Sequence, residues 1–335
     1  MSLAHTLRST WSRALLGACV AVGLSGPVLA ADYTMKLATP TINDLQHEWM
    51  KRYKEELEAR SDGRIEVQLY PASQLGPIQS MLEGLQLGTI EGVIAPAELY
   101  AGVDPRFQVP AIPHLFSSME DARAKLDDPQ VREMLLNIGA EKGLQGLTLL
   151  VYGPQMLNTR QPVATLPDLS GKRIRVLASR TEIGTVEALG ASSVPMPLNE
   201  VGSALQQGVI DGYSTVLDVF NALGTHSVAP NVYKTELWYL ISYGSVSKVW
   251  FDSLPEDLQT LVMDTAKELE QPMFERQVER AAQAVTSWES AGGSITEMTE
   301  EDSATANAAA ETIAQDFVAA NPALQEIYEA LKSAN

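Results

Sequence analysis

The octapeptide L-Q-L-G-T-I-E-G at residues 85–92 recurs as L-Q-Q-G-V-I-D-G at residues 205–212. Both copies have the form L-Q-x-G-x-I-[DE]-G, in which a helix ends on a glycine that tolerates the left-handed cap conformation and a short strand begins at once. Similar elements surround the two copies, so the repeat predicts two structurally related lobes. The alternative, two unrelated helix-to-strand turns that converged on one sequence, stays open for a single octapeptide.

Strand and helix patterns alternate outward from the first copy. Residues 33–37 and 64–70 alternate polar and apolar side chains, as strands do. Between them, large apolar or aromatic residues recur every four positions from Leu45 to Leu57 and predict a helix that ends at Asp62-Gly63. The same patterns recur at residues 146–152, 172–178, 181–189 and 193–196. Such alternation predicts α/β architecture with largely parallel sheets.

A long helix is predicted from residue 258 to about residue 290, a stretch without glycine. Pro272 lies inside it, so we expect a kink or a break there. A helix of about thirty residues would be roughly 45 Å long, more than one lobe requires, and could connect both lobes. After Gly292-Gly293, a short strand at residues 294–298 and two helical segments complete the chain.

The first thirty residues have the pattern of a secretory signal peptide. Arg8 and Arg13 precede an apolar run at residues 14–29, and V-L-A at residues 28–30 forms a small-residue cleavage site. The alternative is a lipoprotein signal with Cys19 as the acylated residue. Only five apolar residues separate Arg13 from Cys19, below the usual length of roughly 7–15, which favours simple cleavage. We therefore expect an exported protein, and no other stretch is apolar for long enough to span a bilayer.

Composition narrows the possible functions. The chain has 335 residues, enough for two lobes with filled cores, and its 42 acidic against 24 basic side chains give a net charge of −18. So acidic a chain is a poor candidate for binding nucleic acid or an anionic membrane. With one cysteine, neither a disulfide framework nor a cysteine-ligated zinc site can form.

Motifs for catalysis are absent from the sequence. There is no G-x-S-x-G elbow, phosphate-binding loop, G-x-G-x-x-G fingerprint or H-E-x-x-H pair. His47, His114 and His226 are far apart and lack the spacing of metal ligands. We therefore expect no enzyme activity and no cofactor.

One cation stands out by its place in the pattern K-R-I-R-V-L at residues 172–177. Alternation puts Ile174 and Val176 on one face of the predicted strand and Arg175 on the other. The planar guanidinium group of an arginine matches the two oxygens of a carboxylate. The residues alone leave two further possibilities open for Arg175, an internal salt bridge and simple exposure on an edge strand.

Four blocks in the same order resemble a known family. They are G-R-I-E-V-Q-L-Y-P-A-S-Q-L-G at residues 63–76, the segment 166–176 that ends in K-R-I-R-V, the segment 189–212 that includes the second octapeptide, and Leu254-Pro255 before the long helix. Together they resemble the periplasmic solute-binding proteins of TRAP transporters, the DctP type, over nearly the whole chain after the signal peptide.

The resemblance implies a two-lobed periplasmic binding protein fold with hinge strands and a long lobe-spanning C-terminal helix. It implies a first lobe at residues 31–152, a second at 153–240, a return to the first with the long helix at 241–280, and a second-lobe segment with C-terminal helices at 281–335. A ligand would be bound between closing lobes and delivered to the membrane permease by a periplasmic monomer. A ligand-binding subunit of a sensor and, less favoured, an exported enzyme are the alternatives.

The resemblance also suggests the ligand-binding residues. Arg175 occupies the position of the arginine that grips the ligand's carboxylate. Gln155 stands where sugar-acid-binding relatives have a second arginine, Thr215 where an asparagine is common, and Leu198 where an aromatic residue is common. The carboxylate that metal-dependent relatives carry after Asp211-Gly212 is missing, so we expect no metal.

These departures remove polar groups from the expected cleft, and four aromatic residues near it could form an apolar lining: Tyr152, Tyr213, Trp238 and Tyr239. One arginine suits one carboxylate. We therefore expect a small organic monocarboxylate, aromatic or aliphatic, rather than a polyhydroxylated sugar acid, because each unpaired buried polar group costs about 1–3 kcal/mol.

Overall fold

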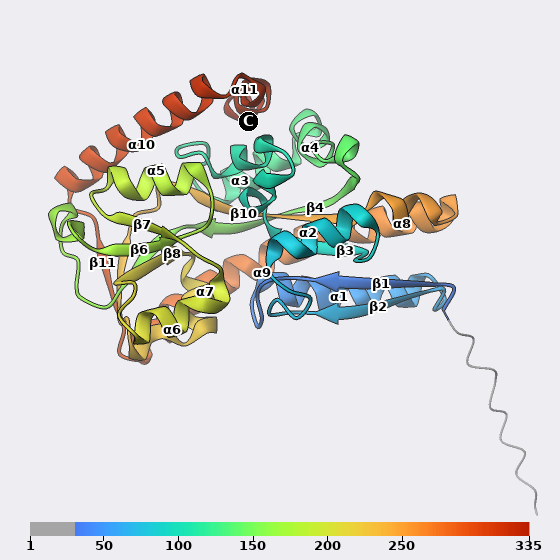
Figure 1. Cartoon of the computed structure of the whole chain (residues 1–335), viewed down its shortest axis with the longest axis horizontal. Helices are drawn as coiled ribbons and strands as arrows, with labels where there is room; N and C mark the ends of the chain where they lie inside the picture. The colour runs from blue at the N-terminus through green and yellow to red at the C-terminus, as the bar shows by residue number, and fades with distance from the viewer. Residues whose placement is uncertain (1–30, 335) are drawn as a thin grey trace, which may run out of the picture. The chain divides into compact units, whose positions relative to one another are not determined.

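The computed structural model describes residues 31–334, which form two mixed sheets surrounded by helices (Figure 1). The first sheet has the strand order β2-β1-β3-β10-β4, and the second has the order β11-β9-β5-β8-β6-β7. Each sheet carries its own helices, which confirms the predicted two-lobed α/β fold. The predicted signal peptide and Cys19 lie outside the described residues.

Each sheet is built on the same strand–helix–strand–helix–strand unit. The first unit consists of β1 (Tyr33–Ala38), α1 (Leu45–Arg60), β2 (Ile65–Tyr70), α2 (Ile78–Leu87) and β3 (Gly92–Pro96). The second consists of β6 (Arg173–Val176), α5 (Arg180–Ala188), β7 (Ser192–Pro195), α6 (Val201–Gln206) and β8 (Gly212–Thr215). In both units the first strand lies between the other two and pairs with each in parallel. The lobes are therefore structurally related, as the repeated octapeptide predicts.

The two copies of the octapeptide fold in the same way. After helix α2, Gly88 has a φ of 75°, and after α6, Gly208 has a φ of 70°. The amide that follows each glycine donates to a carbonyl five residues back, Thr89 to Gly84 and Val209 to Ala204, both at 2.9 Å. This cap turns the chain directly into β3 and β8.

Neighbouring atoms crowd the position that a Cβ atom would take on the last glycine of each copy, most severely at Gly212. A Cβ on Gly212 would overlap the carbonyl oxygen of Asn158 and lie 2.9 Å from Ile174 Cδ1, whereas on Gly92 it would meet the flexible end of Met35. We expect Gly212→Ala to lower the free energy of unfolding by about 1–3 kcal/mol, and Gly92→Ala by less. Urea denaturation would measure both, and equal losses would contradict this explanation.

The sheets are mixed, so the expectation of largely parallel sheets is wrong. The chain passes from the first sheet to the second through β4 (Leu144–Pro154) and β5 (Met156–Thr159), and it returns through β9 (Asn231–Lys234) and β10 (Tyr239–Ser247). An outgoing strand and a returning strand must run in opposite directions. Accordingly β10 is antiparallel to β3 and β4, and β5 is antiparallel to β8 and β9.

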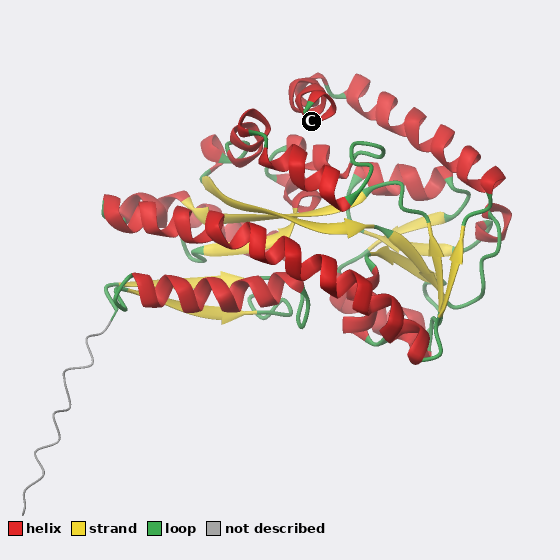
Figure 2. Cartoon of the chain, turned by 180° about the vertical axis from the view of Figure 1, so that it is seen from behind, coloured by secondary structure: helices red, strands yellow, loops and turns green. Residues whose placement is uncertain are grey.

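The long helix α9 (Glu256–Ser290) runs along both sheets (Figure 2). Tyr53 of α1 donates to the carbonyl of Val262, and Asn221 of α7 (Leu217–Leu223) donates to the carbonyl of Ala284. The helix thus contacts both lobes. We predicted a kink or a break at Pro272; the helix continues through it, so the break does not occur, and buried residues on either side of the proline, such as Ala266 and Met273, pack in the same core.

The C-terminal segment also joins the lobes. Strand β11 (Ser294–Glu297) extends the second sheet, and α10 (Glu300–Ala320) packs on α5. Helix α11 (Gln325–Ser333) packs on the first lobe, against α4 (Pro129–Leu136). The remaining helices, α3 (Met119–Asp127) and α8 (Lys248–Ser253), belong to the first lobe.

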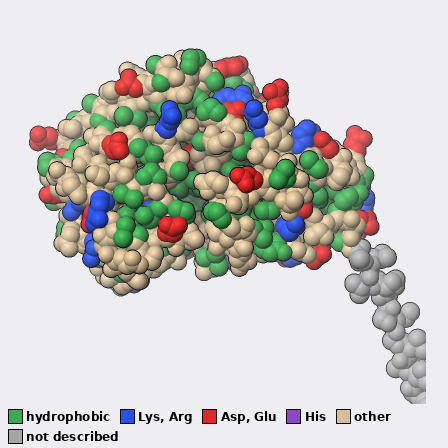
Figure 3. Space-filling model, in the orientation of Figure 1, with side chains coloured by type: hydrophobic (Ala, Val, Ile, Leu, Met, Phe, Trp, Pro, Cys, Tyr) green, Lys and Arg blue, Asp and Glu red, His purple; other side chains and the backbone are tan. Residues whose placement is uncertain are grey.

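Acidic and basic side chains are interspersed over the face shown in Figure 3, and neither sign forms a broad patch there. Within residues 31–334, no helix is both long enough and apolar enough to cross a membrane.

Candidate functional site

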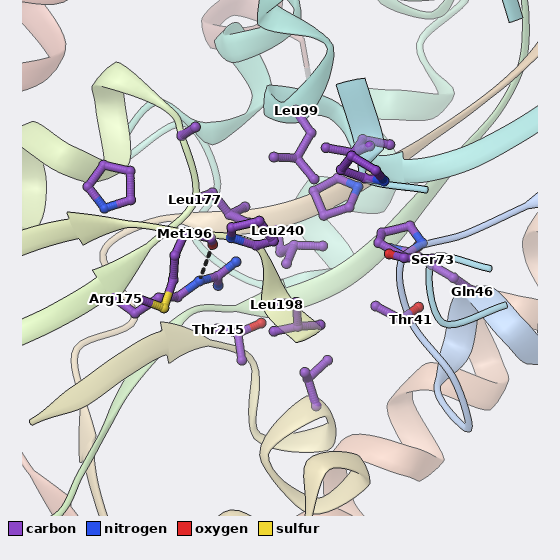
Figure 4. A pocket seen from close by; sticks show the side chains of 18 of the residues that line it. Thr41, Gln46, Ser73, Leu99, Arg175, Leu177, Met196, Leu198, Thr215 and Leu240 are labelled. Atoms are coloured by element: carbon purple, nitrogen blue, oxygen red, sulfur yellow. Dashed lines mark hydrogen bonds between the residues drawn. The ribbon is translucent and has the colours of Figure 1, made fainter. Parts of the chain in front are cut away.

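A cavity of about 170 Å³ lies between the two lobes (Figure 4). Parallel strands of both sheets end at it, which is where ligands bind in α/β folds. The first sheet and its helices contribute Pro40, Thr41, Gln46, Ser73, Pro77, Ile78, Gln79, Pro96, Leu99, Tyr152 and Leu240. The second sheet and its helices contribute Arg175, Leu177, Ala178, Pro195, Met196, Pro197, Leu198, Thr215 and Val219.

Arg175 is the single charged residue among these lining residues. Its strand neighbours Ile174 and Val176 are buried in the core of the second lobe, so alternation turns Arg175 to the opposite face, toward the cavity. The side chain is 1% exposed, and its Nε donates to the carbonyl oxygen of Met196 at 2.9 Å.

The two terminal nitrogens of Arg175 have no hydrogen-bond or salt-bridge partner among residues 31–334. Neither the internal salt bridge nor the exposed position that the sequence left open is observed. A buried guanidinium group therefore offers the paired donors that a carboxylate accepts.

Two buried carboxyl groups, one from each lobe, act on the charge of Arg175. Glu98 lies on the 3-10 segment η1 (Ala97–Gly102) that follows β3, and Glu182 lies in the first turn of α5. Burial lowers the pKa of Arg175, and the negative charges of Glu182 and Glu98 oppose that change. Neither carboxyl group lines the cavity.

Two polar side chains of the first-lobe wall, Gln46 and Tyr152, are already engaged in hydrogen bonds. Gln46 accepts a hydrogen bond from Thr39 at 2.7 Å and donates one to Ser242 at 3.0 Å. The hydroxyl oxygen of Tyr152 accepts from the backbone amide of Leu45 at 3.2 Å. These bonds hold both side chains in place at the wall.

Apolar side chains make up most of the remaining lining. Five prolines surround the cavity: Pro40, Pro77, Pro96, Pro195 and Pro197. Leu99 and Leu240 approach from the first lobe, and Leu177 and Leu198 from the second (Figure 4). Proline fixes the backbone angle φ, so much of the wall has few conformations available.

The structure brings four of the eight sequence-predicted residues to the cavity: Arg175, Tyr152, Leu198 and Thr215. The other four have different surroundings. Gln155 lies at the crossing between β4 and β5, where its amide donates to the carbonyl of Trp238 at 2.9 Å and its side chain lies between Glu98 and Ser214. It is buried at the crossing between the two sheets and is not part of the lining.

Three predicted aromatic residues belong to cores. Tyr213 bonds Thr225 at 2.7 Å and packs edge-on against Phe220. Trp238 is buried in the core of the second lobe, and Tyr239 packs on Phe116. Tyr213 precedes the strand end by two residues, which places its ring below the cavity rather than at it.

Met196, Leu99 and Gln46 also line the cavity, although no motif in the sequence marked them as site residues. Met196 directly follows β7, so the rule that ligands meet strand ends would have found it. Within the described part of the chain, no group of three His, Cys, Asp or Glu side chains could hold a metal ion.

Polar contacts connect the lobes at two places. Arg280 of α9 donates to both carboxylate oxygens of Asp218 on α7, at 2.9 and 3.0 Å, and to Glu48 of α1 at 3.3 Å. On another side, the backbone amide of Arg180 donates to Gln108 at 3.0 Å. A molecule in the cavity would be enclosed by both lobes.

Comparison with known proteins gives consistent results. The family description "bacterial extracellular solute-binding protein, family 7" (DctP) matches residues 38–321. The C4-dicarboxylate-binding periplasmic protein DctP of Rhodobacter capsulatus is 29% identical over 257 residues, covering 74% of this chain and 77% of that protein. The 2,3-diketo-L-gulonate-binding periplasmic protein YiaO of Escherichia coli is 28% identical over 249 residues, covering 72% and 76%.

The comparison with solved structures points to the same family. The TRAP periplasmic solute-binding protein of Xanthobacter autotrophicus, with bound β-D-galacturonate, superposes with a TM-score of 0.84 at 27% identity and covers 90% of this chain and 100% of that one. The family match spans most of the chain, including both lobes and the hinge strands. This chain therefore belongs to the DctP family of bacterial extracellular solute-binding proteins, the periplasmic solute-binding components of TRAP transporters.

Proposed function

We propose that this protein captures a small monocarboxylate of largely apolar character, aromatic or aliphatic, between its two lobes and presents it to a TRAP permease. The observation that carries the proposal is Arg175, whose terminal nitrogens are free within an otherwise uncharged and mostly apolar cavity. Arg175 would clamp the carboxylate, with Thr215 and Tyr152 beside it and Leu198 against the rest of the ligand.

The charges of the cavity favour one carboxylate over two. A C4-dicarboxylate would bring a second negative charge, for which no second cation is present among the lining residues. A buried charge without a partner is strongly unfavourable. A sugar acid would instead bring several hydroxyl groups to a mostly apolar lining, where each unpaired polar group costs about 1–3 kcal/mol.

The size of the cavity is consistent with such a ligand. An engineered cavity of about 150 Å³ in another protein binds benzene, and this cavity measures about 170 Å³. We place the hinge at residues 153–155 and 235–238, between the strands of the two sheets, and propose that the protein acts as a monomer without catalysis. Arg175 and Tyr152 are the titratable groups of the lining, and they form no nucleophile–base pair.

A thermal-shift panel tests the proposal. Residues 31–335 would be unfolded and refolded to remove any bound compound, then melted with benzoate, phenylacetate, 4-methylpentanoate, hexanoate, succinate and galacturonate. An acid present at a thousand times its dissociation constant should add about 4 kcal/mol of stability. We expect shifts with one or more of the four monocarboxylates and none with their carboxamides. Shifts confined to galacturonate or succinate, or equal shifts with a carboxamide, would contradict the proposal.

A further inference from the structure

Glu98 and Glu182 form a buried carboxyl pair between the lobes that carboxylate binding does not use directly. Glu98 is 2% exposed and Glu182 is 0% exposed. One oxygen of Glu98 is 3.4 Å from the side-chain nitrogen of Gln155, and one oxygen of Glu182 accepts from the amide of Leu177 at 3.1 Å. The second oxygen of each carboxyl group is buried without a hydrogen-bond partner among the described residues.

The charged and polar groups that face this pair are few. Arg175 and Tyr213 lie in the second sheet, Ser179 and Ser214 are neutral, and Gln155 comes from the hinge. Burial raises the pKa of Tyr213, which keeps it neutral. The side chain of Arg180, the next basic residue along α5, is exposed. Arg175 is therefore the single cation set against both carboxyl groups.

A bound carboxylate changes the charge balance of this region. With both glutamates ionised, the ligand would add a third negative charge beside one buried guanidinium group. Buried charges that lack partners are avoided by a shift of the pKa and a change of protonation. Because Glu98 and Glu182 belong to different lobes, opening of the lobes would separate the two carboxyl groups and favour the ordinary ionised state of Glu98.

We propose that ligand capture by this protein is linked to protonation: closure of the lobes over a carboxylate transfers one proton from solvent to Glu98. Glu98 and Glu182 then act as positioning residues, which set the charge around Arg175 without touching the ligand. The inference rests on the proposed function, since it requires an anionic ligand on Arg175 and lobes that open.

The direction of the pH dependence follows from the pKa of Glu98. Burial, and next the negative charge of Glu182, raise this pKa to about 8, against an ordinary value of 4.5. A group whose pKa is higher in the closed state than in the open state stabilises closure at low pH. This stabilisation is lost as the pH rises through the pKa of the closed state. Affinity should therefore fall as the pH rises from 6 to 8, by at most about tenfold per pH unit for one proton.

Isothermal titration calorimetry of the intact protein provides the test. The probe is whichever of benzoate, phenylacetate, 4-methylpentanoate and hexanoate gives the largest thermal shift, and it is fully ionised at pH 7. Titrations in phosphate and in Tris, which differ in ionisation enthalpy, give the number of protons taken up. We expect close to one proton for each ligand bound. Binding of the probe with no proton uptake would overturn the inference and leave the binding function intact.

Matched variants identify the group that takes up the proton. Glu98→Gln should bind the probe and lose both the proton uptake and the fall in affinity between pH 6 and pH 8. Glu91→Gln is the control, because burial also raises the pKa of Glu91, but that residue pairs with Lys36 and does not line the cavity. It should keep the wild-type pH profile. An unchanged profile in Glu98→Gln would overturn the assignment.

Discussion

Replacing Arg175 by alanine is expected to weaken carboxylate binding roughly 30- to 4,000-fold. Truncating one partner of a buried, hydrogen-bonded charge pair costs about 2–5 kcal/mol. Arg175 meets this description because it is 1% exposed and its two terminal nitrogens are free for the ligand. Calorimetric titration with the strongest-binding monocarboxylate of the thermal-shift panel would measure the loss.

Two variants separate the role of Arg175 from general effects of charge. Arg173 lies two residues earlier on the same strand, but its side chain is 45% exposed and pairs with Asp211 at 3.0 Å, so Arg173→Ala should leave affinity within about twofold. Arg175→Lys keeps the charge and loses the planar pair of donors, so we expect an intermediate affinity. Wild-type affinity in a folded Arg175→Ala protein would disprove the clamp.

The repeated octapeptide made the architecture predictable from the sequence. Its glycines and the alternating strands predict the two strand–helix–strand–helix–strand units, because each turn and each strand in them depends on only a few neighbouring residues. The crossing strands could not be recognised in this way. The chain crosses to the second sheet through β4 and β5 and returns through β9 and β10, and this path depends on how the two lobes pack together. The hydrophobic pattern of a buried strand does not reveal whether the strand runs parallel or antiparallel to its neighbours.

The site was partly predictable for a similar reason. Strand alternation predicted that Arg175 lies on the face of β6 opposite to Ile174 and Val176, and in the structure that face is turned toward the cavity. Tyr213, Trp238 and Tyr239 could not be distinguished from ligand contacts, since a buried aromatic residue has the same sequence signature in a core and in a pocket. Glu98 and Glu182 lie 84 positions apart and become neighbours only when the lobes meet.

The largest stability effect is expected at Glu270, on the face of α9 that packs against the first lobe. Its side chain is fully buried, and Arg132 donates to it twice, at 2.8 and 2.9 Å. The hydroxyl of Thr148 and the amide of Leu149, both on β4, donate to one of its oxygens at 2.9 and 3.1 Å. Glu270 therefore joins the long helix to strand β4, which leads from the first sheet to the second, and to helix α4.

Glu270→Ala should lower the free energy of unfolding by about 3–5 kcal/mol, because removing one partner of a buried ion pair leaves the other charge uncompensated. Glu268 is the matched control on the same helix: it also pairs with an arginine, Arg60 at 2.9 Å, but its side chain is 65% exposed. Glu268→Ala should cost less than 1 kcal/mol, as exposed pairs do. Urea denaturation of both variants gives the comparison. A loss at Glu270 no larger than the loss at Glu268 would mean that packing around Pro272, rather than this ion pair, holds the long helix to the first lobe.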